Sequence, residues 1–172
     1  MPEIIFETER LLVRRFTLED TELFHRLNSE EAIIRYIRPA KSRQENDTFL
    51  QDNLHIYQQT PAYGRWAMLL KQTGEMVGTF AVFPLDNTEE IQLGYALFPE
   101  HWGQGFATES TQGGITYVFE QLKLPYVVAV TEAANIASQK VLLNTGFAEN
   151  STYERGGKQL KKFIKHNSTS FS

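Results

Sequence analysis

The sequence predicts one mixed α/β domain, α+β-like in its chain order, with a central sheet and helices on both faces. Two observations support this fold class. Three strand-like segments in the middle of the chain are separated by short turns, and the second half then alternates helices with strands. A chain of 172 residues, 41% hydrophobic and 22% charged, is typical of one globular domain. We assign residues 1–166 to this domain and expect the Ser-rich residues 167–172 to form a frayed tail.

The N-terminal part is predicted to contain one strand and three helices. Residues Arg10–Phe16 alternate loosely between polar and apolar side chains, as in a strand. A helix of about ten residues follows from Leu18, and a short helix covers Glu31–Ile37. Pro39 stops the short helix, because proline cannot continue a helix interior. A third helix covers Lys41–Gln58, where apolar residues recur at helical spacing.

The middle of the chain is predicted to form an antiparallel meander. Its strands are Arg65–Lys71, Met76–Phe83 and Glu90–Phe98, and turn residues separate them. Every second residue from Ile91 to Leu97 is apolar, so one face of the third strand is expected to be buried.

Two helices and three strands are expected after residue 98. The helices run from Phe106 to about Leu122 and from about Asn135 to Asn144, and the strands are Tyr126–Val130, Phe147–Arg155 and Gln159–Lys165. The unbroken apolar run Tyr126–Val130 is typical of a parallel strand covered on both faces. Gly156 and Gly157 indicate a hairpin between the last two strands.

Composition excludes several kinds of chemistry. The chain has no cysteine, which rules out disulfides, thiolate nucleophiles and Cys-based zinc sites. The four histidines have no metal-ligand spacing, so we expect no metal. A net charge of −4 argues against a nucleic-acid partner. We find no signal peptide and no apolar run of membrane-spanning length, so we expect no membrane association and a cytoplasmic location.

A Gly-rich segment, His101–Thr108, lies between a predicted strand and a predicted helix. Gly103 and Gly105 allow the backbone to turn sharply, and the free N–H groups at the start of the next helix can then bind a phosphate. An ordinary strand-to-helix turn would have the same residues. The segment matches neither the dinucleotide-binding fingerprint nor the Walker A loop.

Three segments, in order along the chain, resemble the GNAT superfamily of N-acetyltransferases, in particular its RimJ/RimL-like branch. Residues Gln92–Glu109 resemble the acetyl-CoA motif, Glu7–Asp20 the first strand with the helix start after it, and Asn135–Phe147 the second cofactor motif. The resemblance implies a GNAT-type fold, whose mixed sheet splays between two parallel strands. It also implies direct transfer of an acetyl group from acetyl-CoA to a primary amine.

The resemblance further implies how CoA is bound. The pyrophosphate is expected on the backbone of the Gly-rich turn, the pantetheine between the splayed strands, and the oxyanion on a main-chain N–H near Leu97 or Phe98. The residues expected to contact CoA are Leu97, Phe98, Trp102, Gly103, Gln104, Gly105, Phe106, Ala107, Thr108, Asn135 and Ser138. For Asn135 the alternative is a helix cap, and for Ser138 an exposed position without a role.

The sequence departs from the family where proton transfer is expected. Leu142 stands at the usual position of a tyrosine that protonates the thiolate, and Gln92 stands where relatives carry a glutamate. Ser138 is therefore the candidate for assisting the thiolate, and Glu90 the candidate for a base acting through water. Glu90 could equally be a solvated residue at a strand end, with water alone removing the proton.

The acceptor site is the least defined by the sequence. Trp66, Tyr95 and Gln92 are the candidates for contacting the amine, although aromatic residues in strands more often belong to a core. A protein N-terminus and a small amine (an antibiotic, polyamine or amino acid) both remain open as acceptors. A CoA-binding sensor without catalysis is the alternative from another class. The oligomeric state is open, a homodimer included.

Overall fold

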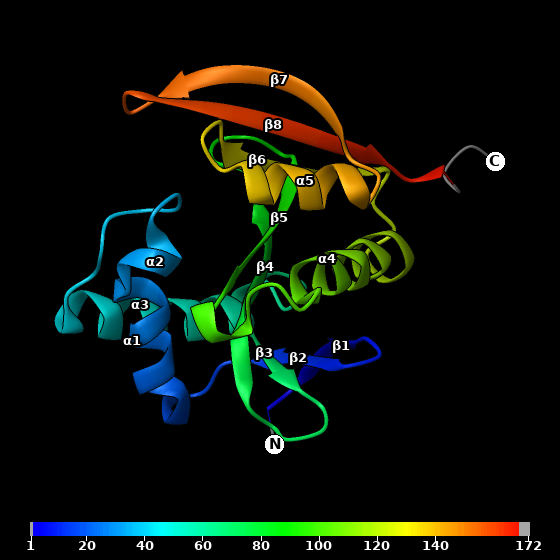
Figure 1. Ribbon diagram of the computed structural model, residues 1–172. Coiled ribbons are helices and arrows are strands. Elements are labelled where there is room, and N and C mark those ends of the chain that lie inside the picture. Colours follow the sequence, from blue (N-terminus) through cyan, green and yellow to red (C-terminus); the bar gives the residue numbers. More distant parts are fainter. Residues whose placement is uncertain (1, 169–172) are drawn as a thin grey trace.

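The computed structural model describes residues 2–168, which form an eight-stranded sheet with helices on both faces (Figure 1). The order across the sheet is β1-β2-β3-β4-β5-β6-β8-β7. The strands are β1 (Ile4–Glu7), β2 (Leu11–Arg15), β3 (Gly64–Leu70), β4 (Met76–Pro84), β5 (Ile91–Leu97), β6 (Tyr126–Glu132), β7 (Ala148–Arg155) and β8 (Lys158–His166). The α-helices are α1 (Thr21–Ser29), α2 (Glu31–Ile34), α3 (Arg43–Gln59), α4 (Phe106–Thr116) and α5 (Ile136–Asn144).

The predicted meander is confirmed, because β2, β3, β4 and β5 pair antiparallel in sequence order. Strand β1 was not predicted. It is a four-residue edge strand, antiparallel to β2, and only its Phe6 is buried. With one buried position it has too few residues to produce an alternating pattern.

The sheet opens between β5 and β6. These two strands are parallel, and their backbones pair only at Gln92 and Val128. Strand β8 pairs antiparallel with the other edge of β6 and also with β7, so it separates those two strands. The prediction of a parallel strand at residues 126–130 therefore holds for the β5 side only. The single pairing leaves the C-terminal part of β5 without a strand on that side.

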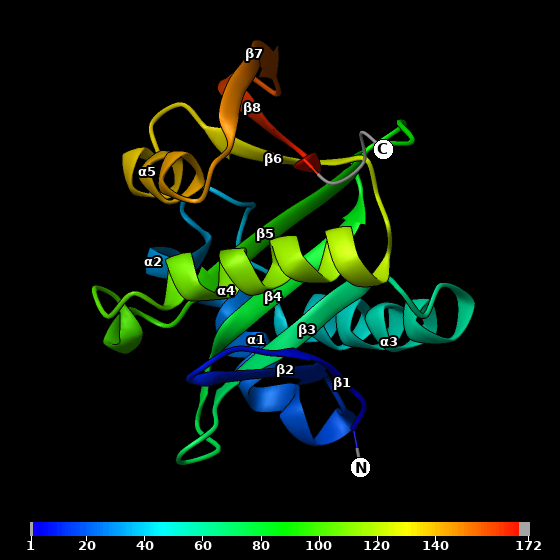
Figure 2. The same cartoon turned by 90° about the vertical axis from the view of Figure 1, so that its right-hand side faces the viewer.

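The helices divide into two layers (Figures 1 and 2). Helices α1, α2 and α3 cover one face of the sheet, over a core that includes Phe16, Phe24 and Phe98. Helix α4 covers the other face, over a core that includes Trp66 and Phe80. The layers meet the same strands from opposite sides, since adjacent residues of a strand point to opposite faces.

Three predicted elements end at different places in the structure. The helix predicted to reach Leu122 ends as an α-helix at Thr116 and continues as a π-helical turn, Tyr117–Gln121. A 3-10 turn precedes α1, and α2 ends at Ile34 rather than at residue 37. Asn167, assigned to the tail, is only 7% exposed and its N–H donates to the Pro125 carbonyl at 2.9 Å. The rest of the tail from residue 169 lies outside the described residues.

Candidate active site

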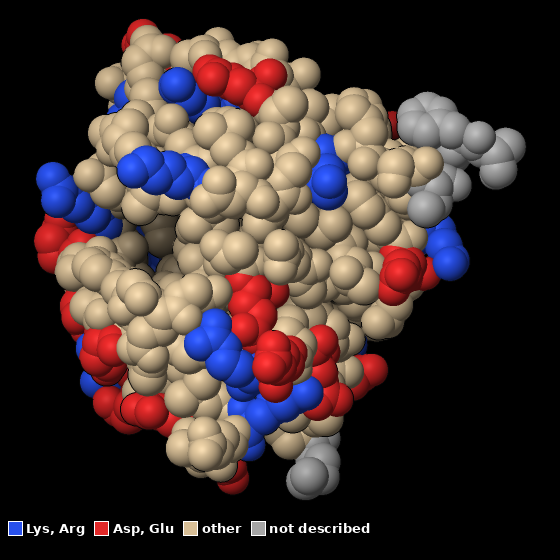
Figure 3. All heavy atoms as spheres, turned by 45° about the vertical axis from the view of Figure 1, so that its right-hand side comes forward, with Lys and Arg blue, Asp and Glu red and all other residues tan. Residues whose placement is uncertain are grey.

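A cavity of about 670 Å³ lies where β5 ends, between the Gly-rich turn, the segment around α2 and the start of α5. Its walls include Tyr95 and Leu97 from β5, Phe106 from α4, and Asn135 and Ser138 from α5. A hollow with Lys or Arg atoms beside it is visible on the surface of this side of the molecule (Figure 3). The cavity therefore brings together residues from the two segments that the sequence associates with CoA.

The Gly-rich turn has the backbone geometry of an anion site. Gly103 and Gly105 have φ angles of +73° and +83°, which side chains with a Cβ rarely adopt. Gly105 is the N-cap of α4, no side chain caps this helix, and the N–H of Glu109 donates to the Gly105 carbonyl at 3.0 Å. The N–H groups ahead of Glu109 have no acceptor one helical turn earlier, so they can bind the pyrophosphate of acetyl-CoA.

Trp102 connects this turn to the end of β5 through a hydrogen bond. Its indole Nε1 donates to the Leu97 carbonyl at 3.0 Å, and the side chain is 51% exposed. The exposed ring is therefore held by its polar edge. The Leu97 carbonyl points away from β4, because the N–H of the same peptide group, that of Phe98, donates to the Val77 carbonyl of β4.

The orientation of β5 decides which N–H can face the reacting thioester. The Phe98 N–H donates to the Val77 carbonyl at 2.9 Å and is not free. Adjacent residues of an antiparallel strand direct their N–H groups to opposite sides, so the Leu97 N–H faces the open side of β5. Phe98 is 1% exposed and belongs to the core under α1 and α3. The expectation that Phe98 contacts CoA is therefore corrected, and Leu97 remains the candidate oxyanion donor.

Asn135, Ser138 and Tyr95 meet at the cavity wall. Asn135 caps α5, since its Oδ1 accepts from the Ser138 N–H at 3.2 Å. This cap uses the oxygen of the Asn135 side chain and leaves its NH₂ group to reach a ligand. Burial raises the pKa of the Tyr95 hydroxyl, and hydrogen bonding to Ser138 opposes this shift. Tyr95 therefore stays protonated at neutral pH and lies beside Ser138.

Leu142 is 2% exposed and is part of the core. It does not line the cavity at the end of β5, so no hydroxyl from the usual tyrosine position reaches this site.

Two sequence candidates are not brought to the site. Glu90 precedes β5 and forms an ion pair with Lys162 of β8, and it does not line the cavity at the end of β5. Trp66 is fully buried under α4, where its ring contacts Tyr117 edge-on at a centroid distance of 5.5 Å. Both predictions are corrected: Glu90 is held by a lysine distant in sequence, and Trp66 is a core residue.

The Gln104 side chain also points to protein, because its Nε2 donates to the Glu100 carbonyl at 3.2 Å. Any contact of Gln104 with CoA would have to use its backbone.

A second cavity, of about 460 Å³, adjoins the first. The two share Tyr36, Ile37, Tyr95 and Ala96 among their lining residues. Gln92 lines only the second cavity, which extends from the end of β5 toward β7 and β8. Its walls carry four basic side chains, Arg38, Arg65, Arg155 and Lys158, which the sequence analysis did not predict. Of these four residues, only Arg65 stands out in the sequence, because it is a charged residue within a predicted strand.

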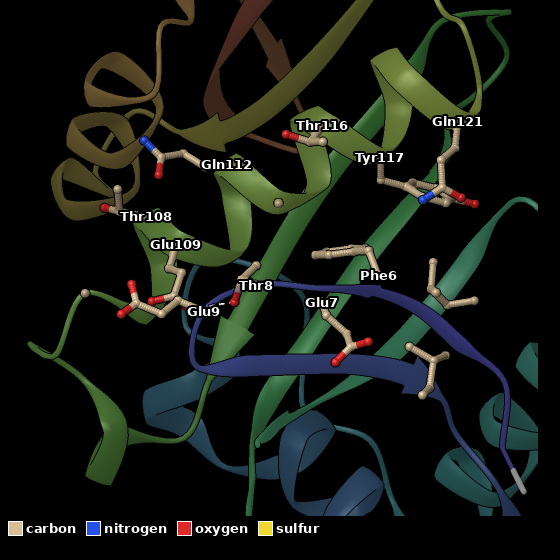
Figure 4. Close-up of a pocket in the computed structure, with 14 residues that line it drawn as sticks. Phe6, Glu7, Thr8, Glu9, Thr108, Glu109, Gln112, Thr116, Tyr117 and Gln121 are labelled. Atoms are coloured by element: carbon tan, nitrogen blue, oxygen red, sulfur yellow. Dashed lines mark hydrogen bonds between the residues drawn. The ribbon is translucent and has the colours of Figure 1, made fainter. Parts of the chain in front are cut away.

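A third and larger groove, of about 990 Å³, runs between β1 and α4 (Figure 4). Phe6 and Thr8 face it from the first strand and the residues after it, and Glu109 and Gln112 face it from the helix (Figure 4). Thr8 Oγ1 donates to Glu109 Oε2 at 2.5 Å, so the central polar groups of this groove satisfy each other. The first two cavities are therefore the stronger candidates for the reaction site.

No group of three or more His, Asp or Glu side chains within residues 2–168 is arranged to hold a metal ion. None of the described helices is both long and apolar enough to cross a membrane.

Known proteins of similar sequence and fold define the class. Residues 10–148 match the family model of the acetyltransferase (GNAT) domain. The chain is 32% identical over 146 residues to the uncharacterized N-acetyltransferase YoaA of Bacillus subtilis, which covers 83% of this chain and 82% of YoaA.

Two solved structures share the fold. One is RimL, a ribosomal L7/L12 alpha-N-protein acetyltransferase, with a TM-score of 0.80, 20% identity, and coverage of 97% of this chain and 96% of RimL. The other is spermidine N-acetyltransferase from Vibrio cholerae in complex with CoA and spermine, with a TM-score of 0.78, 20% identity, and coverage of 92% of this chain and 96% of that enzyme.

The fold and the two cavities, with these matches, define an acyl-CoA-dependent N-acetyltransferase whose co-substrate is acetyl-CoA. The chain belongs to the GNAT family of acetyltransferases.

Proposed function

We propose that this enzyme transfers the acetyl group of acetyl-CoA directly to the primary amine of a small molecule. The observation that carries this proposal is the second cavity, of about 460 Å³, which adjoins the proposed thioester site. Small-molecule sites usually have volumes of about 300–1,000 Å³ and a few convergent polar groups. The protein N-terminus expected from the RimJ/RimL resemblance is the alternative acceptor.

The proposed reaction is a single displacement at the thioester carbon. The amine nitrogen attacks this carbon, the negative charge develops on the carbonyl oxygen, and the bond to sulfur then breaks. The Leu97 N–H is proposed to stabilise the oxyanion because it faces the open side of β5. Ser138 and Tyr95 are proposed to donate hydrogen bonds to the departing thiolate, since both line the first cavity.

Water is proposed to take the proton that the amine loses. The carboxylates that line the second cavity are Asp86 and Glu132. Asp86 forms an ion pair with Arg155, and Glu132 forms one with Lys158 at 3.2 Å. Both carboxylates are thus engaged by cations, and the proposal is that the amine attacks from the fraction already deprotonated in water.

The test is an acceptor screen with the purified protein. Release of CoA thiol is followed with acetyl-CoA and two matched sets: small primary amines, and peptides of about eight residues with free N-termini. Turnover of small amines with kcat/KM at least tenfold above that of every peptide supports the proposal. Preference for peptides would contradict it and favour the N-terminal acceptor. Binding of acetyl-CoA without turnover of either set would also contradict it.

A further inference from the structure

Two arginines line the second cavity without a carboxylate partner. Arg38 follows α2, and its Nη1 donates to the neutral Oδ1 of Asn28 at 2.7 Å. Arg65 lies in β3, and its guanidinium makes no hydrogen bond or ion pair with a described residue. Both guanidinium carbons lie over the ring of Phe49, at 5.4 and 4.9 Å from its centroid. Both side chains thus contact the same aromatic ring through cation–π interactions, without an ion pair to a carboxylate.

The other charges of the cavity neutralise each other. Asp86 pairs with Arg155 and Glu132 pairs with Lys158. Among the described lining residues, Arg38 and Arg65 are the remaining charges, so the cavity has a positive excess in a protein of net charge −4. Two partly buried like charges repel, and such an arrangement is stabilised when an anion binds between them.

The sheet leaves room in front of Arg65. Arg65 pairs with Ala81 across β3 and β4, and Ala81 pairs with Gly94 across β4 and β5. All three residues line the cavity. A Cβ placed on Gly94 would have no atom within 4 Å. The row of small residues therefore leads from Arg65 to the open edge of β5, where Ala96, on the same face of the sheet as Gly94, lines both cavities.

Burial lowers the pKa of Arg38, and burial lowers that of Arg65 to about 10, with the charge of Arg38 acting in the same direction. Tyr57 and Asp86 oppose the shift of Arg65. Both guanidinium groups remain charged at neutral pH.

From this geometry we infer that the acceptor amine also carries a carboxylate, which binds to Arg38 and Arg65 while its amine reaches the thioester near Tyr95. A guanidinium donates two parallel hydrogen bonds to a carboxylate, and the two guanidinium groups that have no carboxylate partner together suit one such anion. A phosphate offers guanidinium groups the same kind of oxygen acceptors, so aminoalkyl phosphates are the competing acceptors in the test below. This inference rests on the proposed function and names the class of its substrate.

The experiment compares acceptors that differ only in the carboxylate. Linear ω-amino acids of four to six carbons and α-amino acids are assayed beside their carboxamides and beside aminoalkyl phosphates. Arg38→Gln and Arg65→Gln are compared with Arg43→Gln, whose guanidinium pairs with Glu22 on the surface. We expect the wild type and Arg43→Gln to favour at least one carboxylate over its carboxamide by about tenfold or more in kcat/KM. Each cavity variant should lower that ratio at least fivefold.

A binding measurement tests the preference for a carboxylate without requiring turnover. Calorimetry with the N-acetylated carboxylate and the N-acetylated carboxamide, in the presence of CoA, should show the same preference and the same loss. Circular dichroism and thermal melting verify that the variants fold. If Arg65→Gln does not fold, Arg38→Gln and Arg65→Lys carry the test.

Each outcome supports or overturns the inference. Equal use of carboxylates and carboxamides, or a preference for phosphates, overturns it while leaving acetylation of small amines intact. An unchanged ratio in both cavity variants overturns it as well, because a merely structural role of the arginines would give that result. Turnover of peptides alone overturns both the inference and the proposed function.

Discussion

Arg10 and Glu109 are 99 residues apart in the chain, and Arg10 Nε donates to Glu109 Oε1 at 2.7 Å. Glu109 Oε2 also accepts from the Arg10 N–H at 2.8 Å and from Thr8 Oγ1. Since Glu109 lies in the first turn of α4, these bonds attach the start of the helix to the turn between β1 and β2. The same contacts place Arg10 beside the glycine turn, where its Nη2 is 3.3 Å from the position of a Cβ on Gly105.

Glu109→Gln should lower the free energy of unfolding by about 1–2 kcal/mol at pH 7, because it weakens three charge-assisted hydrogen bonds. Burial raises the pKa of Glu109, but the bonds from Thr8 and Arg10 outweigh it and hold the pKa below its usual value. A lowered pKa stabilises the fold above the unfolded-state value of about 4.3, and this contribution is lost as the pH falls through the folded-state pKa.

Urea unfolding from pH 3 to pH 7 measures this effect. The difference between wild type and Glu109→Gln should be largest near neutral pH and shrink in acid. Glu22→Gln, at an exposed surface ion pair, is the matched control and should cost little at any pH. A pH-independent difference for Glu109→Gln would show that packing, not the charge, is responsible.

Gly105→Glu should reduce affinity for acetyl-CoA by at least about tenfold, because a carboxylate would repel the pyrophosphate. The positive φ of Gly105 adds a backbone strain of about 1–2 kcal/mol, so some loss of stability is also expected. Gly74→Glu is the control for strain and charge, since Gly74 has a φ of +76° and open space around it in another turn. Calorimetry showing equal CoA affinity in both variants would place the phosphate site elsewhere.

Ser138→Ala should lower kcat by about tenfold, or roughly 1.4 kcal/mol of transition-state stabilisation, with acetyl-CoA affinity nearly unchanged. A thiolate with a pKa near 8.5 needs only modest assistance at neutral pH, so the loss should be smaller than for a true general acid. Tyr95→Phe removes the neighbouring hydroxyl at nearly constant volume. Steady-state kinetics of both single variants and the double variant will show whether the two hydroxyls act together. An unchanged kcat in Ser138→Ala would leave that residue without a catalytic role.

The value of kcat/KM should rise with increasing pH, and the pKa of the acceptor amine, rather than that of a side chain, should set the pH at which it rises. The carboxylates of the second cavity are paired, and burial raises the pKa of Tyr95 above its usual value of about 10. Loss of the Tyr95 proton should therefore not lower the rate below about pH 10. Two acceptors that differ by about two pKa units should shift this rise by a similar amount. A rise at one fixed pH for both acceptors would indicate a side-chain base.

The sequence predicted the parts of the site whose requirements are local. The glycines of the turn indicate positive φ angles, and Asn135 is a favoured N-cap residue ahead of a helical pattern. Glu90 was placed wrongly because its partner, Lys162, comes from a strand 72 residues later. Strand β5 also begins after Glu90, so the alternation used to orient that side chain does not extend to it.

The acceptor cavity could not be predicted because its parts are distant in the sequence. Arg38 comes from a loop and Arg65 from β3. The charges that neutralise each other come from the connection between β4 and β5, from β6 and from the last hairpin. A charged residue inside a strand pattern is usually solvated, which made Arg65 unremarkable in the sequence. Trp66 beside it was misassigned for the opposite reason, since only the fold decides which face of β3 meets a cavity and which meets the core.

The single backbone pairing between β5 and β6 has a mechanical consequence. Strands β6, β8 and β7 share one antiparallel hydrogen-bond network, whereas the link from β6 to the meander is limited to the pair Gln92 and Val128. If pantetheine lies in this gap, as the resemblance to the GNAT superfamily implies, the co-substrate adds hydrogen bonds between two parts of the sheet that share a side-chain core but only one backbone pairing. Amide exchange along the facing edges of β5 and β6 should then slow on CoA binding, while exchange within the β3–β4 ladder stays as it was.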